Sequence, residues 1–96
     1  MTLQTILQLT CDAFEFPIEK IQSKSRKRVY VECRVAYAYL ARNRKYKLRE
    51  ISAEINRKHN NINHYYSYAL DSLNVYPNSI LSTLIKILET KIKNQK

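Results

Sequence analysis

The sequence predicts an all-α fold: a small helical domain with a basic loop and a helix-turn-helix, followed by an amphipathic C-terminal helix. Apolar residues recur at spacings of three and four along the chain, and the alternation of a half-buried strand is hard to find. Glycine is absent, so the two prolines, Pro17 and Pro77, are the main helix breakers. With 96 residues, 45% of them hydrophobic, the chain predicts a single domain with one small core.

The N-terminal half is expected to contain two helices separated by a short turn and a basic loop. One face of the first helix carries Leu3, Ile6, Leu7, Thr10 and Phe14. This helix ends near Phe16 because a residue before proline is disfavoured in the helical conformation. Ile18 and Ile21 mark the short turn, and residues 23–28 form the basic loop. A long helix over residues 29–43 follows, with an apolar stripe of Cys33, Ala36, Tyr37 and Leu40.

The next segment indicates two helices joined by a tight turn. The first helix is short, and its apolar residues are Leu48, Ile51 and Ile55. Residues 56–59 form the turn, and the second helix carries an apolar stripe of Ile62, Tyr66, Ala69, Leu70 and Leu73. Two helices joined in this way, the second with polar residues at its start, are typical of a helix-turn-helix.

The chain is expected to divide after the helix-turn-helix, with residues 1–75 as one domain and residues 76–96 as a C-terminal helix. Residues 74–78 read as a linker. The helix beyond them is amphipathic, and its stripe consists of Ile80, Leu81, Leu84, Ile85, Leu88 and Ile92. We expect it to pack back on residues 1–75, or on a second chain to form a homodimer, rather than to lie on a membrane surface.

Positive charge is concentrated in the middle of the chain. The protein carries 17 Lys and Arg against 8 Asp and Glu. Residues 20–58 hold 13 of the basic and three of the acidic residues, a balance of +10, whereas the remaining residues balance at −1. Solubility does not need such segregation, which is typical of a surface that binds phosphates.

Features that the sequence lacks limit the expected cellular location and argue against metal binding and catalysis. No apolar run reaches the length of a transmembrane helix, and the first residues lack the basic start of a secretory signal. Cys11 and Cys33 lie far apart within apolar patterns, so we expect free core thiols in a reducing, cytoplasmic and nucleoid-associated setting. The two cysteines together with His59 and His64 do not have the spacing of zinc ligands. No spacing in the sequence supports a catalytic pair either. We therefore expect no metal, no cofactor and no enzyme activity.

Polar side chains gather at the start of the second helix of the pair. With its stripe turned inward, its N-terminus and outer face present His59, Asn60, Asn61, His64, Tyr65 and Tyr68. A helix N-terminus offers unpaired N–H groups and a positive dipole end, which suit a phosphate. Asparagine can bond bidentately to adenine in the major groove, which gives about 1–3 kcal/mol of base discrimination. Alternatively Asn60 or Asn61 caps the helix, and one can cap while its neighbour reads a base.

The basic loop is a second candidate surface. Its positively charged residues are Lys24, Arg26, Lys27 and Arg28. They can reach phosphates, or an arginine can enter a narrow minor groove, where the negative potential is strongest. The alternative is a solvated loop, although its position upstream of a helix-turn-helix favours DNA.

Several of these segments occur in the order and spacing of a known family. They are the loop SKSRKR at residues 23–28, Arg34, YLAR at residues 39–42, LREI at residues 48–51 and HNNINH at residues 59–64. Together they resemble the C-terminal DNA-binding domain of the bacterial replication initiator DnaA, a Trp-repressor-like helix-turn-helix. The signature of that family reads Gly-Gly-Arg-Asp-His-Thr-Thr-Val-Leu-His. The resemblance extends over about residues 3–73.

The resemblance implies a role for each matching position. It implies that Arg26 enters the minor groove, that Arg34 contacts the phosphate backbone, and that the run beginning at His59 reads bases in the major groove. The residues assigned to base reading are Arg26, Lys58, His59, Asn60 and Asn61. The residues assigned to phosphate contact are Lys24, Lys27, Arg28, Arg34, Arg57, His64, Tyr65 and Tyr68.

The chain also departs from the family. Asn56, Arg57 and Lys58 replace Gly-Gly-Arg-Asp, so the turn is one residue shorter and lacks glycine, for which Asn56 is a suitable substitute because asparagine tolerates left-handed conformations. Lys58 replaces an acidic base reader, and Asn60 and Asn61 replace the threonines, so a different recognition sequence is expected. A chain without glycine also cannot form the phosphate-binding loop of an ATPase.

The sequence therefore predicts a sequence-preferring binder of double-stranded DNA, without the ATPase of the replication initiator. Its alternative is a helical protein-interaction adaptor whose basic face binds an acidic partner. Salt dependence separates the two, since DNA binding weakens steeply as salt rises.

Overall fold

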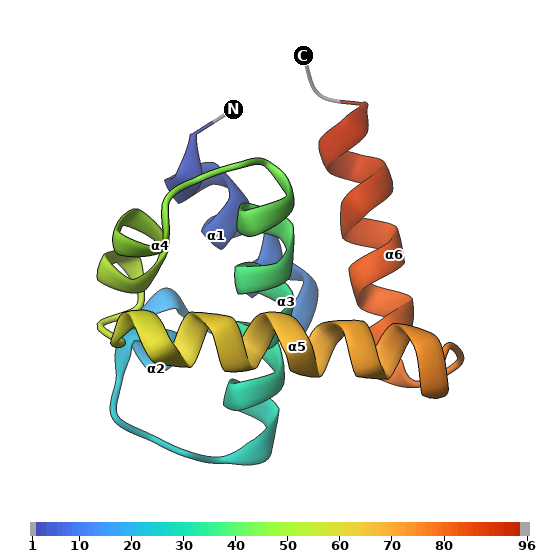
Figure 1. Cartoon of the computed structure of the whole chain (residues 1–96), viewed down its shortest axis with the longest axis horizontal. Coiled ribbons are helices and arrows are strands. Elements are labelled where there is room, and N and C mark those ends of the chain that lie inside the picture. The colour runs from blue at the N-terminus through green and yellow to red at the C-terminus, as the bar shows by residue number, and fades with distance from the viewer. Residues whose placement is uncertain (1, 95–96) are drawn as a thin grey trace.

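Six helices form the part of the protein that the computed structural model describes, residues 2–94 (Figure 1). They are α1 (Leu3–Phe14), α2 (Ile18–Gln22), α3 (Arg28–Asn43), α4 (Leu48–Glu54), α5 (His59–Val75) and α6 (Ile80–Lys93). No strand occurs among the described residues, so the predicted all-α class is confirmed. None of the helices there has the length and apolar character needed to cross a membrane.

The long helix α3 lies at the centre and contacts each of the other five helices. The sequence predicts one apolar stripe for it, but the structure also buries Val35, Ala38 and Ala41 completely. These side chains are covered because neighbouring helices pack around α3 on several sides instead of one. Alanine and valine suit this position, since small side chains let helix axes approach closely.

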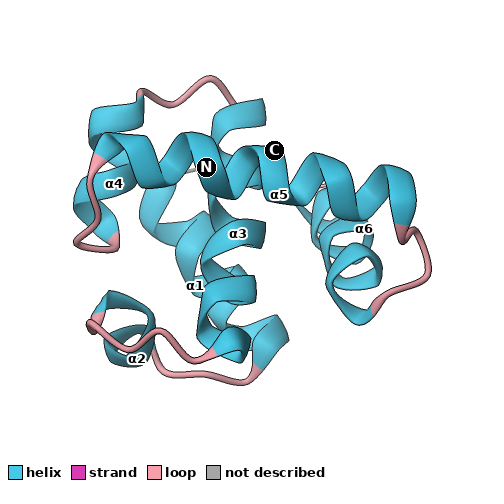
Figure 2. Cartoon of the chain, turned by 60° about the horizontal axis from the view of Figure 1, so that its bottom comes forward, coloured by secondary structure: helices cyan, strands magenta, loops and turns pink. Residues whose placement is uncertain are grey.

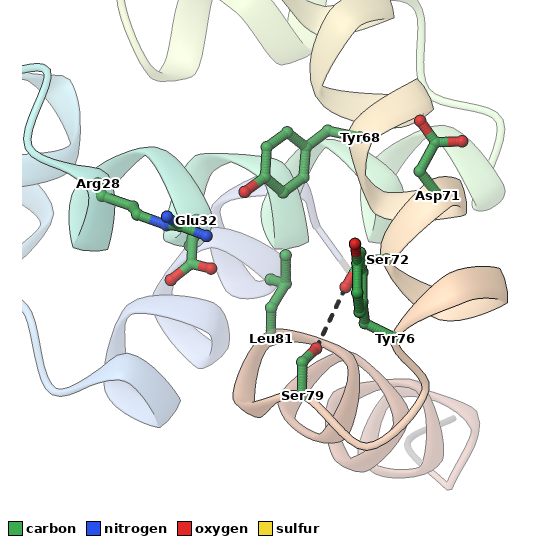
Figure 3. A pocket seen from close by; sticks show the side chains of 8 residues that line it. All are labelled: Arg28, Glu32, Tyr68, Asp71, Ser72, Tyr76, Ser79 and Leu81. Atoms are coloured by element: carbon green, nitrogen blue, oxygen red, sulfur yellow. Dashed lines mark hydrogen bonds between the residues drawn. The ribbon is translucent and has the colours of Figure 1, made fainter.

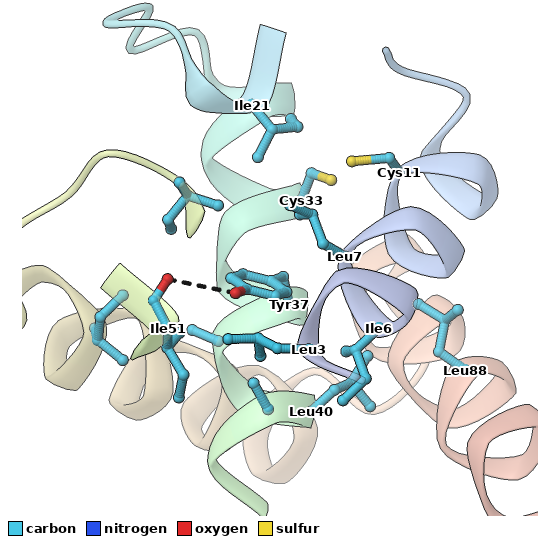
Figure 4. Packing of buried hydrophobic residues seen from close by; sticks show 14 of the residues in the cluster. Leu3, Ile6, Leu7, Cys11, Ile21, Cys33, Tyr37, Leu40, Ile51 and Leu88 are labelled. Atoms are coloured by element: carbon cyan, nitrogen blue, oxygen red, sulfur yellow. Dashed lines mark hydrogen bonds between the residues drawn. The ribbon is translucent and has the colours of Figure 1, made fainter. Parts of the chain in front are cut away.

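The larger part of the core surrounds Tyr37 of α3 (Figure 4). Its aliphatic members come from all six described helices and from the turn after α4, and include Leu3, Ile6, Leu7, Ile21, Leu40, Ile51, Ile55, Ile62, Leu88 and Ile92. Each such side chain contributes about 1.5–3 kcal/mol when fully buried. The Tyr37 hydroxyl donates a hydrogen bond to the carbonyl of Ile51 at 3.3 Å, and burial raises the pKa of this phenol. This bond ties α4 of the helix-turn-helix to the central helix.

The two cysteines are free thiols, as predicted, and both are fully buried. Cys11 of α1 and Cys33 of α3 point toward one another in the core (Figure 4). Their hydrogen bond and their burial raise the pKa of Cys33. Both cysteines therefore pack as small apolar side chains.

The helix ends follow local signals in the sequence. Thr2 caps α1 by accepting a hydrogen bond from the Thr5 N–H at 3.1 Å, and Ser79 caps α6 by accepting one from the Ser82 N–H at 3.1 Å. Glu15 ends α1 in the left-handed conformation, with φ 62°, two residues before Pro17. The proline therefore stops the first helix close to the predicted place.

The C-terminal helix α6 packs on the rest of the domain. Leu88 and Ile92 join the core around Tyr37, while Leu81 and Ile85 pack with Val35, Ala36 and Ala69 in a second cluster. The predicted stripe is wrong at Ile80, which is 80% exposed. This residue is the first of α6 and lies on a different face from the four buried residues, so it has no helix beside it.

Candidate nucleic-acid interface

The helix-turn-helix consists of α4 and α5, joined by residues 55–58 (Figure 2). Asn56 lies in this turn with φ 54°, which is the left-handed region expected at the position where the related family has glycine. The turn is closed by hydrogen bonds to α4, from the Asn56 N–H to the Ala53 carbonyl at 3.4 Å and from the Arg57 N–H to the Ser52 carbonyl at 2.9 Å. Asparagine thus forms the turn without glycine.

The first turn of α5 presents the polar residues that the sequence assigns to base reading. The N-cap is Lys58, with no hydrogen bond from its side chain, so the predicted capping role of Asn60 or Asn61 is wrong. His59 and Asn60 are exposed and Asn61 is half-buried. No hydrogen bond within residues 2–94 engages the side chains of these three residues. Their donors and acceptors are therefore available to a ligand.

The stripe that α5 buries differs from the predicted one. Ile62, Ala69 and Ser72 are buried, and Tyr65 packs against both core clusters, whereas Leu70 is 38% exposed. Adjacent residues of a helix point about 100° apart, so the side on which α5 packs decides which of two neighbouring residues faces the core. Tyr65 therefore contributes to packing, and its predicted phosphate contact stays a prediction.

The basic loop of residues 23–27 leaves its cations in solvent. Lys24, Arg26 and Lys27 are all exposed. Serine side chains shape the backbone between them: Ser23 Oγ accepts from the Ser25 N–H at 3.3 Å, and Ser25 Oγ accepts from the Lys27 N–H at 3.4 Å. Such serine turns let a short loop bend without glycine.

Arg34 holds this loop from the inside. Only 1% of its surface is exposed. Its guanidinium donates four hydrogen bonds to carbonyls of α2 and the loop: Nε to Ile21 at 2.8 Å, Nη1 to Ser25 at 2.8 Å, and Nη2 to Ser23 at 3.1 Å and Lys20 at 3.2 Å.

The prediction that Arg34 contacts the phosphate backbone is therefore wrong, because its donors bond to carbonyls of the protein itself. Burial, and then the nearby charge of Arg57, lower the pKa of Arg34. A guanidinium nevertheless stays protonated in proteins, so the loop folds around a fixed positive charge.

A set of hydrogen bonds, here called the latch, joins the basic loop to the helix-turn-helix. Arg57 Nη2 donates to the Ser23 carbonyl at 2.6 Å, and Asn56 Nδ2 donates to the Gln22 carbonyl at 3.2 Å. In the other direction, Gln22 Nε2 donates to the Glu54 carbonyl at 2.8 Å. Arg57 is half-buried, and its Nη1 donates to two further carbonyls of the turn. Arg57 thus braces the two elements, and its predicted phosphate contact stays a prediction.

A cleft lies between the latched elements, with a volume of about 730 Å³. It brings together seven residues that the sequence assigned to DNA, namely Lys24, Arg26, Arg34, Arg57, Lys58, Asn61 and Tyr65. The remaining lining residues are Val31 and Asn56. No carboxylate lines this cleft, so its charge is strongly positive and suits a polyanion.

Two predicted phosphate ligands lie elsewhere. Arg28 and Tyr68 line a second cleft, between the start of α3, the C-terminal part of α5 and the start of α6 (Figure 3). Glu32 and Asp71 line the same cleft, and their carboxylates disfavour a phosphate there. His64, in contrast, is exposed on the outer face of α5, beside the reading residues.

Sequence reasoning missed residues at both ends of this surface. Asn63 is exposed on the outer face of α5 between the reading residues and His64, and only its position outside the apolar stripe signals this. Gln22 and the Asn56 amide contribute to the latch through backbone carbonyls more than 30 positions away in sequence. No local pattern marks such partners.

The fold and this surface define the class of protein. A small helical domain in which a helix-turn-helix is braced against a basic loop is a DNA-binding domain. The family model of the bacterial dnaA protein helix-turn-helix matches residues 3–67, and the chain belongs to this family. A comparison with curated proteins finds no match. The matched region ends within α5, so α6 lies beyond it.

Proposed function

We propose that this protein binds double-stranded DNA with a base preference, reading the major groove with the start of α5 and the minor groove with the basic loop. The observation that carries the proposal is the positive cleft, which places Arg26 of the loop and Asn61 of α5 on one surface. The latch supports it, since hydrogen bonds hold the two elements in a fixed relation. Two elements that enter neighbouring grooves lose less conformational entropy on binding when their separation is already fixed.

The proposed base readers are Lys58, His59, Asn60 and Asn61 in the major groove and Arg26 in the minor groove. The side-chain amides of the two asparagines have no intramolecular hydrogen bond within the described residues, so they can pair with adenine edges. Lysine and histidine can donate to guanine acceptors. The proposed site is therefore richer in direct donors than the Asp and Thr signature of the related family.

The proposed phosphate contacts come from the exposed cations around these readers. Lys24, Lys27 and His64 are exposed next to them in sequence. Arg28 is exposed as well, but it lines the second cleft and not the positive one. Each neutralised phosphate releases counterions, so affinity should fall linearly with salt on logarithmic axes, with a slope of about −0.9 for each contact.

A binding-site selection on random duplexes, followed by a salt titration on the selected site, tests the proposal. We expect an enriched motif and affinity that falls by orders of magnitude between about 50 and 200 mM salt. Lys91→Ala is the control for substitutions of cations on the proposed surface, since Lys91 is an exposed lysine of α6 outside that surface. The absence of any binding to duplex DNA at low salt would reject the proposal and favour an acidic protein partner for the basic face.

A further inference from the structure

The exposed apolar side chains of this protein are unevenly distributed. Within the family-matched residues 3–67, Val29 is the only exposed large hydrophobic residue, at 49%. Six others lie between positions 68 and 87. Four of them surround the α5–α6 junction and the outer side of α6, and we call these the C-terminal patch: Val75, Tyr76, Ile80 and Ile87, which are 63, 67, 80 and 45% exposed.

The geometry of α6 explains how it can carry two apolar faces. Ile80 and Ile87 are seven residues apart, or about two turns, so they lie on the same side of the helix. The buried residues Leu81, Ile85 and Leu88 occupy a different side, against α3 and α5. The patch is thus additional to the core, and a solvated helix does not need it.

We propose that the C-terminal patch is the interface of a homodimer, with a second copy of this chain as its occupant. Charge is the first argument. Residues 68–94 carry three lysines against Asp71 and Glu89, a balance of +1, whereas residues 20–58 carry +10. Two copies can therefore approach through their C-terminal parts with little repulsion, which their basic surfaces would not allow.

The exposed area is the second argument. From these exposed fractions the four side chains present on the order of 500 Å², about the apolar share of the ~800 Å² per partner that a standard interface buries. The second cleft lies next to this patch. It is bordered by Tyr76 and has a volume of about 500 Å³ (Figure 3). Ser79 and Leu81, the sequence neighbours of the exposed Ile80, also line this cleft, so the patch and the cleft adjoin at the start of α6.

The position of the patch leaves the proposed DNA surface free. The reading residues lie at the first turn of α5, and Val75 ends the same helix 16 residues later, about 24 Å away. A second copy docked there would present its own reading residues on the far side of the dimer axis. The protein would then contact two DNA segments at a separation that the dimer fixes.

Sedimentation velocity on the full chain without DNA, over about 1 to 200 µM, tests the proposal. We expect the wild-type protein to sediment at twice its 11.4 kDa mass at the upper concentrations, and Ile80→Asp and Ile87→Asp to sediment at the monomer mass. Both residues are exposed, so circular dichroism should show an unchanged helical fold. Val29→Asp is the matched control, since it places the same charge at an exposed apolar site outside the patch.

Three results would overturn the dimer. The wild-type chain could remain at the monomer mass throughout, which would assign the patch to a different protein. The two isoleucine variants could stay dimeric, or the Val29 variant could dissociate equally. DNA affinity for a single selected site should be unchanged in Ile80→Asp, so failure of the dimer is distinguishable from failure of DNA binding.

Discussion

The two ends of α5 differ in every property that decides what a protein surface binds. At its start, exposed amides and cations stand beside a basic loop, and no carboxylate lines the cleft between them. At its end, charges nearly balance and aliphatic and aromatic side chains face solvent. A single helix thus separates a positively charged surface from an apolar one. Within residues 2–94, six of the seven exposed large hydrophobic side chains lie beyond the family-matched residues 3–67.

The largest expected effect comes from Arg34, which shapes the charged end from inside. Arg34→Ala removes four hydrogen bonds and leaves the carbonyls of Lys20, Ile21, Ser23 and Ser25 without these partners. We expect a loss of about 3–5 kcal/mol in the free energy of unfolding, measured by urea denaturation. Arg34→Lys should recover only part of it, because an ammonium cannot reproduce the planar fork. Full stability in the alanine variant would contradict the structural role.

Asn61→Ala tests the reading function of the same end. The side chain has no intramolecular hydrogen bond to lose within the described residues, so stability should change little. We expect a loss of about 1–3 kcal/mol of discrimination at one or two base pairs, measured by competition between the selected site and single mismatches. Asn74→Ala, near the other end of α5, is the control and should leave the preference intact. Equal preference in both variants would exclude Asn61 as a reader.

Arg26→Ala tests the basic loop. Because this arginine is exposed and the loop is held by Arg34, the variant should fold normally. We expect weaker binding to all duplexes and a salt slope smaller by about one, measured by fluorescence anisotropy at several salt concentrations. A slope equal to that of the wild type would remove Arg26 from the contact.

Asn56 should give the smallest effect. Asn56→Ala places alanine, which tolerates the left-handed conformation less well than asparagine, at φ 54°, and it also removes the hydrogen bond to the Gln22 carbonyl. We therefore expect a loss of about 1–2 kcal/mol in the free energy of unfolding. Asn56→Gly relieves the backbone but loses the same bond, and its loss should be smaller. Thermal unfolding of both variants distinguishes the conformational cost from the cost of the latch. An alanine variant more stable than the glycine variant would contradict this account of the turn.

The sequence predicts the helices of this protein well because their signals are local. Spacing locates the long helix, proline stops the first one, and the left-handed turn residue Asn56 follows from its residue type. The fate of the arginines is not predictable in this way. Arg34 and Arg26 look alike in sequence, yet the carbonyls that accept from Arg34 lie 9 to 14 residues before it and approach only in the folded chain.

The stripe of α5 shows a second reason for error. Tyr65 and Tyr66 are neighbours with identical side chains, and periodicity alone favours Tyr66 as the inner one. In the structure Tyr65 faces both clusters, while Tyr66 stacks on Tyr39 with ring centroids 5.3 Å apart and donates to Asn43 Oδ1 at 2.7 Å. Both rings are half-buried, and the crossing of α5 over α3 decides which tyrosine packs against the core clusters. That crossing depends on the whole core.

The latch gives the proposed DNA contact the character of bivalent binding. In the proposed complex, the loop is already held near the neighbouring groove when α5 enters the first groove. The effective concentration of the loop at that second groove is then set by the three hydrogen bonds of the latch and not by the flexibility of a linker. Little conformational entropy remains to be lost at the second contact. Weakening the latch should therefore reduce avidity for DNA even where every side chain that touches it is intact.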